Sequence, residues 1–187
     1  MRTIDGERHF CEVFLDEVRV PVANLVGDEN DGWRVTNVTL RFERGTAFAQ
    51  HIITLRAQIR TLVELALGTS AGSGTAWDDP VLRDHVGRIE AGVDALWRMT
   101  QMGITEAERT GTPASSGSAV KLRYSELAQE IADLTLRTIG RPALAGADER
   151  ARDAAREYLW SLQYTIAAGT SQIQRNLIAE RILGMPR

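Results

Sequence analysis

Apolar residues recur at intervals of three and four along most of the chain, the spacing that gathers them on one face of an α-helix. The first such stretch spans Gly32–Leu67, and others span about 80–110 and 118–139. A fourth helix is expected over Arg150–Ile166, and a last one from a Thr170 cap to about Leu183. The sequence therefore predicts an all-α fold, an antiparallel four-helix bundle with a short β-remnant at its N-terminal end.

The same spacing predicts which residues face the core of this bundle. From the first helix these are Val35, Val38, Phe42, Thr46, Ala49, Ile52, Ile53 and Ile59. From the second they are Val86, Ile89, Val93, Leu96, Trp97 and Ile104. From the third they are Val120, Tyr124, Leu127, Ile131 and Leu134.

Helix-capping and helix-breaking residues separate these stretches. Asp78-Asp79-Pro80 supplies a cap and a first-turn proline for the second helix, and Gly140-Arg141-Pro142 ends the third. We expect interhelical loops at Gly68–Ala76 and Gly111–Gly117. The first is rich in Gly and Ser but lacks the lysine of a phosphate-binding loop, so we interpret it as a plain connection between helices. Ahead of the helices, Glu7–Leu15 and Val18–Val20 are expected to form two short strands.

Composition narrows the function classes. With 187 residues the chain can bury a core, and its net charge of −3 gives no reason to expect nucleic acid or an anionic membrane surface as a partner. No apolar run is long enough to cross a membrane and no signal peptide is visible. The single cysteine, Cys11, fits a reducing cytoplasm, and the three histidines lack the spacing of metal ligands, so no metal site is expected.

Two separate motifs carry a resemblance to a known family. Ala168–Arg187 reads A-G-T-S-Q-I-Q-R-N-L-I-A-E-R-I-L-G-M-P-R, and Phe10–Gly45 contains F-C-E-V-F-L-D-E-V-R-V-P-V-A-N-L-V-G-D-E-N-D-G-W. Both resemble the acyl-CoA dehydrogenase family: the first its C-terminal signature, the second its passage from the middle β-domain into the C-terminal helical domain. The resemblance implies that residues 1–30 end the β-domain and that 31–187 form the helical bundle domain.

The resemblance also implies which residues carry the chemistry. The most common base of the family is a Glu directly before the Gly-Thr of the signature, and here that position is Ala168. A branch of the family instead carries its base in an L-x-x-E-R run on the first helix, which matches Leu40–Arg44 and makes Glu43 the expected base. Arg44 is the expected substrate-binding residue, and Thr170 and Gln172 are the expected contacts to FAD.

A dehydrogenase of this family would oxidise an acyl-CoA thioester with FAD, pass its electrons to an electron-transfer flavoprotein, and work as a homo- or hetero-oligomer. The family's R-x-x-F-G motif is absent at Gly74–Asp79, and its glycine-rich motif is reduced to one glycine in Arg137–Pro142. Two alternatives stay open beside the dehydrogenase. One is a non-catalytic subunit that completes the FAD site of a partner. The other is an acyl-CoA oxidase or flavin monooxygenase relative.

Overall fold

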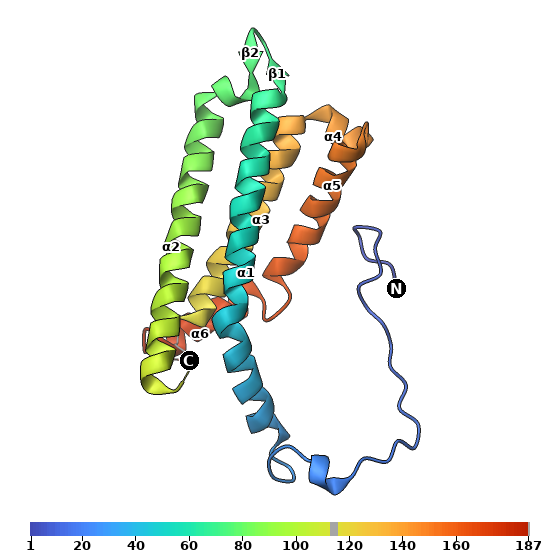
Figure 1. Ribbon diagram of the computed structural model, residues 1–187, viewed down its shortest axis with the longest axis vertical. Helices are drawn as coiled ribbons and strands as arrows, with labels where there is room; N and C mark the ends of the chain where they lie inside the picture. The colour runs from blue at the N-terminus through green and yellow to red at the C-terminus, as the bar shows by residue number, and fades with distance from the viewer. Residues whose placement is uncertain (113–115, 187) are drawn as a thin grey trace.

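The computed structural model describes residues 1–112 and 116–186, and for 41–47 only the backbone. Long helices dominate the described part, and Figure 1 shows them running side by side. The elements in chain order are η1 (Val22–Asn24), α1 (Gly32–Gly68), β1 (Ser70–Ala71), β2 (Gly74–Thr75), η2 (Ala76–Asp78), α2 (Pro80–Thr110), α3 (Gly117–Ile139), α4 (Arg141–Ala145), α5 (Glu149–Ser161), η3 (Leu162–Thr165) and α6 (Ser171–Arg181). The predicted all-α class and helical bundle are confirmed.

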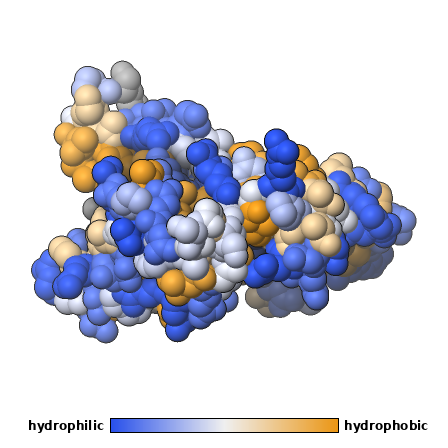
Figure 2. All heavy atoms as spheres, turned by 90° about the horizontal axis from the view of Figure 1, so that it is seen from above, coloured by the Kyte–Doolittle hydropathy of each residue, from blue (hydrophilic) through white to orange (hydrophobic). Residues whose placement is uncertain are grey.

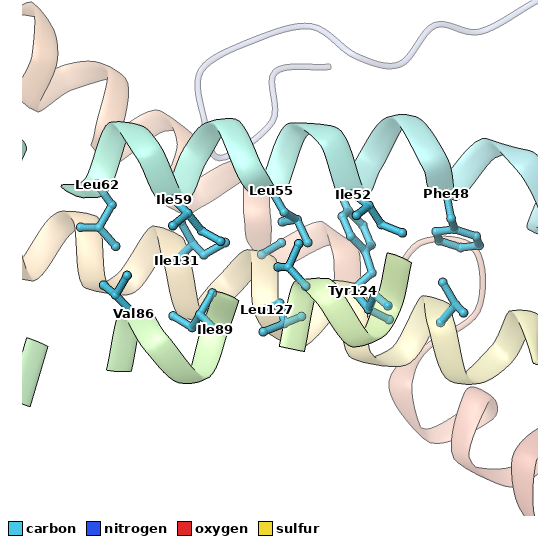
Figure 3. Packing of buried hydrophobic residues seen from close by; sticks show 14 of the residues in the cluster. Phe48, Ile52, Leu55, Ile59, Leu62, Val86, Ile89, Tyr124, Leu127 and Ile131 are labelled. Carbon is cyan, nitrogen blue, oxygen red and sulfur yellow. The ribbon is translucent and has the colours of Figure 1, made fainter. Parts of the chain in front are cut away.

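The hydrophobic core lies where α1, α2 and α3 pack together, and Figure 3 shows its side chains interleaving between these helices. Its largest fully buried side chains are Ile52, Leu55, Leu62, Val93, Leu96 and Leu127, each at most 1% exposed. Burying one such side chain contributes about 1.5–3 kcal/mol. The core is therefore a large source of stability, and α5 and α6 pack against α3.

The predicted helix ends are confirmed where the caps could be recognised. Asp79 caps α2 by accepting a hydrogen bond from the backbone N–H of Val81, and Pro80 occupies the first turn. Gly111 ends α2 with φ of 70°, and Gly140 ends α3 with φ of 72°, a backbone conformation that side chains with a Cβ rarely adopt.

The structure corrects several local expectations. The segment Gly68–Ala76 is not a plain loop, because Ser70 and Ala71 pair with Thr75 and Gly74 in a small antiparallel hairpin. The two strands expected at Glu7–Leu15 and Val18–Val20 are absent from the described residues, where this segment is extended without strand partners (Figure 1). A strand exists only when a neighbour satisfies its backbone hydrogen bonds, and the described chain offers none there.

The buried face of α1 also differs from the expectation. Val38 is 43% exposed and Ile53 is 59% exposed, whereas Leu55 and Leu62, which were not on the expected face, are almost fully buried. Phe42 and Thr46 lie outside the described side chains. The reason is physical: α1 carries apolar residues on more than one face, so periodicity alone does not choose the face that α2 and α3 cover.

The outer surface mixes polar and apolar areas. Figure 2 shows a mostly hydrophilic end of the molecule with separate hydrophobic patches. Large exposed apolar side chains gather in the N-terminal segment, among them Phe10, Val13, Phe14 and Leu15. This segment touches α5 where the ring of His9 lies 4.1 Å from that of Trp160. Among the described helices, none has both the length and the apolar character that a membrane span requires.

Candidate functional site

A cavity of about 450 Å³ lies between α1, α3 and the segment that leads into α6. We call it the turn cavity. Its described lining residues are Leu40, Phe48, His51, Lys121, Tyr124, Ser125, Gln163, Tyr164, Ala167, Ala168 and Gly169. The cavity therefore joins residues about 130 positions apart in sequence, from the start of α1 and from the turn before α6.

The turn that closes this cavity leaves regular helix geometry. After α5 the chain tightens into the 3-10 helix η3, and then Ala168 and Gly169 take φ values of 54° and 90°. A Cβ on Gly169 would lie 2.7 Å from Nε2 of Gln174, so a side chain here would displace that buried amide as well as strain the backbone. Ala168 pays a conformational cost at a positive φ, which the surrounding bonds must offset.

Three polar side chains of α3 hold this turn. They are Lys121, Ser125 and Gln129, spaced by four residues and so aligned on one side of the helix. We call them the polar ladder. Lys121 Nζ donates to the carbonyl oxygens of Tyr164 at 2.9 Å and Gly169 at 2.7 Å, and Ser125 Oγ donates to the same Tyr164 oxygen at 2.8 Å.

The third member of the ladder acts one turn further along. Gln129 Nε2 donates to the carbonyl oxygen of Ser161 at 3.3 Å and to the hydroxyl of Thr165 at 3.1 Å. The last carbonyls of a helix have no partner within that helix. The ladder supplies such partners to the end of α5, to η3 and to the turn that follows.

The other side of the turn is held by α6. Thr170 caps this helix, its hydroxyl accepting from the backbone N–H of Ile173 at 3.3 Å. Gln174 is fully buried and donates from Nε2 to the carbonyl oxygen of Ala168 at 3.0 Å. Gln174 Oε1 and Ser171 Oγ are buried without a hydrogen-bond partner among the described residues, which leaves two polar atoms near the start of α6 unsatisfied.

Two titratable groups that line the turn cavity are favoured in their neutral forms. Burial lowers the pKa of His51 below its usual value, which favours the uncharged ring at pH 7. Burial, with the neighbouring Tyr164, raises the pKa of the Tyr124 hydroxyl well above its usual range. Among the described residues that line the cavity, Lys121 is the one Lys, Arg, Asp or Glu, and it is only 3% exposed.

The sequence-predicted site residues fare differently. Glu43 and Arg44 lie on α1 but outside the described side chains, although Leu40 and Phe48 on either side of them line the turn cavity. Thr170 caps α6 next to the cavity-lining Gly169, while Gln172 is exposed on the first turn of α6. Sequence reasoning missed the polar ladder, whose signal was three polar residues at a spacing of four on the side of α3 away from its apolar stripe.

A second cavity, the α5 cavity, has a volume of about 720 Å³ and lies between α1, α3 and α5. Its walls include Ile131, Ile139 and Leu65. Gln58 Nε2 donates to Glu157 Oε1 at 2.7 Å across it. Burial raises the pKa of the Glu157 carboxyl, opposed by the bond from Gln58. In the described residues no cluster of three or more His, Cys, Asp or Glu could hold a metal ion in this cavity or elsewhere.

Comparison with known proteins identifies relatives of the whole chain. A family profile described as "Acyl-CoA dehydrogenase, C-terminal domain" matches residues 30–183. Acyl-CoA dehydrogenase IpdE1 of Mycobacterium tuberculosis is 35% identical over 184 residues, which cover 98% of this chain and 46% of IpdE1. Its counterpart in Mycolicibacterium smegmatis is 34% identical over 98% of this chain and 44% of its own length. The chain thus spans about half the length of these relatives.

Solved structures show the same helical arrangement. A glutaryl-coenzyme A dehydrogenase in complex with glutaryl-CoA matches with a TM-score of 0.78 at 20% identity, over 92% of this chain and 43% of that one. At that identity the likeness shows the fold alone. The ChsE4-ChsE5 complex from Mycobacterium tuberculosis contains a chain that matches with a TM-score of 0.72 at 29% identity, over 93% of this chain and 46% of that one.

Proposed function

The chain belongs to the acyl-CoA dehydrogenase family, and from that membership we propose that it forms the C-terminal half of an FAD-dependent acyl-CoA dehydrogenase. In this proposal residues 31–187 are the helical bundle domain, 1–30 end the preceding β-domain, and Glu43 is the catalytic base. The reaction is α,β-dehydrogenation of an acyl-CoA thioester to a trans-2-enoyl-CoA.

One observation carries the proposal. Ala168, at the position where most relatives have their Glu, lines the same cavity as Leu40 and Phe48, which flank Glu43 on α1. A base supplied from α1 would therefore serve the cavity that a base at 168 would serve. In this proposal the carboxylate that position 168 lacks is supplied instead by Glu43.

The protein's part in this chemistry is proton removal and positioning. Glu43 would take the α-proton of the acyl group, and Arg44 would bind the substrate beside it. Burial against apolar groups raises the pKa of a carboxyl group towards the pH of the reaction, which would make such a base more effective. FAD, when bound, supplies the acceptor for the hydride that leaves the β-carbon.

The start of α6 fits a role in holding FAD. The first N–H groups of a helix have no partner within it and attract anions such as a pyrophosphate. Thr170 and Gln172 are the residues we assign to FAD, and Gln172 is accessible on the exposed side of that turn. The buried Ser171 Oγ and Gln174 Oε1 add polar atoms without partners in the described chain.

We further propose that the protein works as an oligomer in the cytoplasm, with an electron-transfer flavoprotein as its electron acceptor. The similarity to a chain of the ChsE4-ChsE5 complex supports an assembly of more than one chain, either a homo-oligomer or a hetero-oligomer.

The test uses the complete enzyme, in which this chain is present together with the N-terminal half that the proposal requires. It follows acyl-CoA-dependent flavin reduction. Glu43→Gln should lower the rate of flavin reduction by about 10²–10⁴-fold, the usual contribution of a positioned base, without releasing FAD. Glu64→Gln, an exposed glutamate on the same helix, is the matched control and should leave the rate unchanged. Adding Ala168→Glu to Glu43→Gln should restore part of the rate. Unchanged turnover in Glu43→Gln would refute the assignment.

A second candidate is a non-catalytic subunit that completes the FAD site of a hetero-oligomeric dehydrogenase. The observation that favours it is the similarity to a chain of the two-component ChsE4-ChsE5 complex. In that case Glu43→Gln would leave the rate of the complex intact, and the corresponding Glu→Gln change in the partner would abolish it.

A further inference from the structure

The chain contains twenty-one arginines but a single lysine, Lys121, and that lysine is buried at the turn cavity. We propose that Lys121 is the positioning residue of this site, fixing the turn that carries Ala168, Gly169 and the cap of α6. The inference concerns the site to which the proposed function assigns FAD and substrate. The role of Lys121 in fixing the turn does not depend on that function.

Two hydrogen bonds of Lys121 lie on either side of the turn. Its ammonium bonds the carbonyl oxygen of Tyr164, inside η3, and that of Gly169, directly before the Thr170 cap. These two carbonyls are five residues apart in sequence, so a single ammonium group bonds both ends of the turn. Hydrogen bonds from a charged donor are stronger than neutral ones, contributing about 1.5–3 kcal/mol each.

The chemistry of the position explains why lysine stands where the rest of the chain uses arginine. Two carbonyl oxygens must be reached from one point in a closed space. An ammonium is a compact charge with three donors that rotate freely, whereas a guanidinium is a planar fork suited to two parallel acceptors. Ser125 Oγ shares the Tyr164 oxygen at 2.8 Å, which leaves little room for a larger head group.

The turn at Ala168 and Gly169 requires such hydrogen bonds to keep its shape. Ala168 holds a positive φ without being glycine, a conformation that persists only where neighbouring bonds enforce it. Gln174 Nε2 bonds the carbonyl oxygen of Ala168 from the α6 side, and Lys121 bonds that of Gly169 from the α3 side. Removing the ammonium should therefore free the turn and the first turn of α6 while leaving the apolar core of α1 and α2 intact.

The experiment follows hydrogen–deuterium exchange of the full 187-residue chain and of three variants. Lys121→Met keeps the side-chain length without the charge. Lys121→Cys in a Cys11→Ser background, alkylated with 2-bromoethylamine while unfolded and then refolded, restores an ammonium of nearly the same reach. The matched control is Arg137→Met, which removes an exposed cation near the other end of α3.

We expect amides of 164–174 to exchange at least about tenfold faster in Lys121→Met, equivalent to about 1.4 kcal/mol of local opening. The alkylated cysteine should return exchange to within about twofold of the parent chain, and Arg137→Met should leave it unchanged. In the complete enzyme, if it oxidises an acyl-CoA, kcat/KM should fall and recover in the same order.

Unchanged exchange at 164–174 in Lys121→Met would overturn the proposal. An equal rise of amide exchange in α2 would also overturn it, because that would mean general destabilisation rather than loss of two local hydrogen bonds. Failure of the alkylated variant to recover would show that packing, not the ammonium, matters. An enzyme without acyl-CoA oxidation would count against the proposed function alone, since the exchange comparison needs no turnover.

Discussion

Two faces of α3 illustrate two ways of holding helices together. Towards α1 and α2, α3 presents Leu127 and Ile131 to an apolar core in which contacts are many and none is directional. Towards the chain after α5, it presents Lys121, Ser125 and Gln129, whose hydrogen bonds reach named carbonyl oxygens. The core fixes how close the helices lie, and the polar ladder fixes the shape of one irregular turn.

The difference indicates where the molecule can tolerate change. An apolar core absorbs modest changes in shape at a graded energetic cost, because neighbouring side chains repack. A hydrogen-bonded turn does not, since a lost donor leaves a carbonyl unsatisfied at a single point. The turn cavity is built on the second kind of support, which suits a site that must hold its atoms in place.

The largest effect should come from the apolar side of this comparison. Leu127→Ala removes a fully buried side chain and should lower the free energy of unfolding by about 2–5 kcal/mol through lost burial and a cavity. Urea denaturation would measure it. Leu67→Ala, at a side chain 52% exposed, is the control and should cost below about 0.5 kcal/mol. Equal losses in both would mean that the assigned core does not carry the stability.

Next in size is a substitution in the turn. Gly169→Ala combines a left-handed backbone with a clash against Gln174 and should cost about 1–3 kcal/mol, measured as a drop in Tm. Gly72→Ala, at φ of 59° with no atom within 4 Å of the added Cβ, isolates the backbone cost. A loss no greater at 169 than at 72 would contradict the close packing of Gln174.

A smaller effect should follow loss of the α6 cap. Thr170→Ala leaves the N–H of Ile173 without its side-chain partner and should cost about 1 kcal/mol, whereas Thr170→Ser keeps the hydroxyl and should cost less. Amide exchange at the start of α6 would detect the change. No difference between the two variants would show that the hydroxyl does not stabilise the helix.

The smallest effect concerns the α5 cavity and depends on pH. Burial raises the folded-state pKa of Glu157 above the usual 4.5, so the folded chain holds this proton more tightly than the unfolded chain. Stability should therefore fall as pH rises from about 4.5 through the raised pKa. Glu157→Gln should flatten that slope in urea midpoints taken between pH 4 and 8. Glu64→Gln, at an exposed site, should not.

The sequence was sufficient for those parts of the fold that depend on local chemistry. The ends of α2 follow from Asp79-Pro80 and Gly111, and its buried face follows from one clean apolar stripe. On α1 the same reasoning put Ile53 inward, and the structure leaves it 59% exposed. Two apolar faces compete on that helix, and only the positions of α2 and α3 decide between them.

The candidate site was less accessible to prediction. Thr170 could be recognised as a cap because the cap bonds a residue three positions away. Two partners of Lys121 are backbone oxygens 43 and 48 residues away, and a carbonyl leaves no mark in a sequence. Glu43 and Arg44 rest on family resemblance, and their roles stay predictions.

The lone lysine also makes the chain a convenient chemical reporter. In a 187-residue polypeptide of this sequence, reagents that acylate primary amines have two targets, the α-amino group of Met1 and the Nζ of Lys121. The first lies in the open, and the second is enclosed by the turn it holds. The rate at which a second label attaches, read directly by mass, would therefore time the spontaneous openings of the turn cavity.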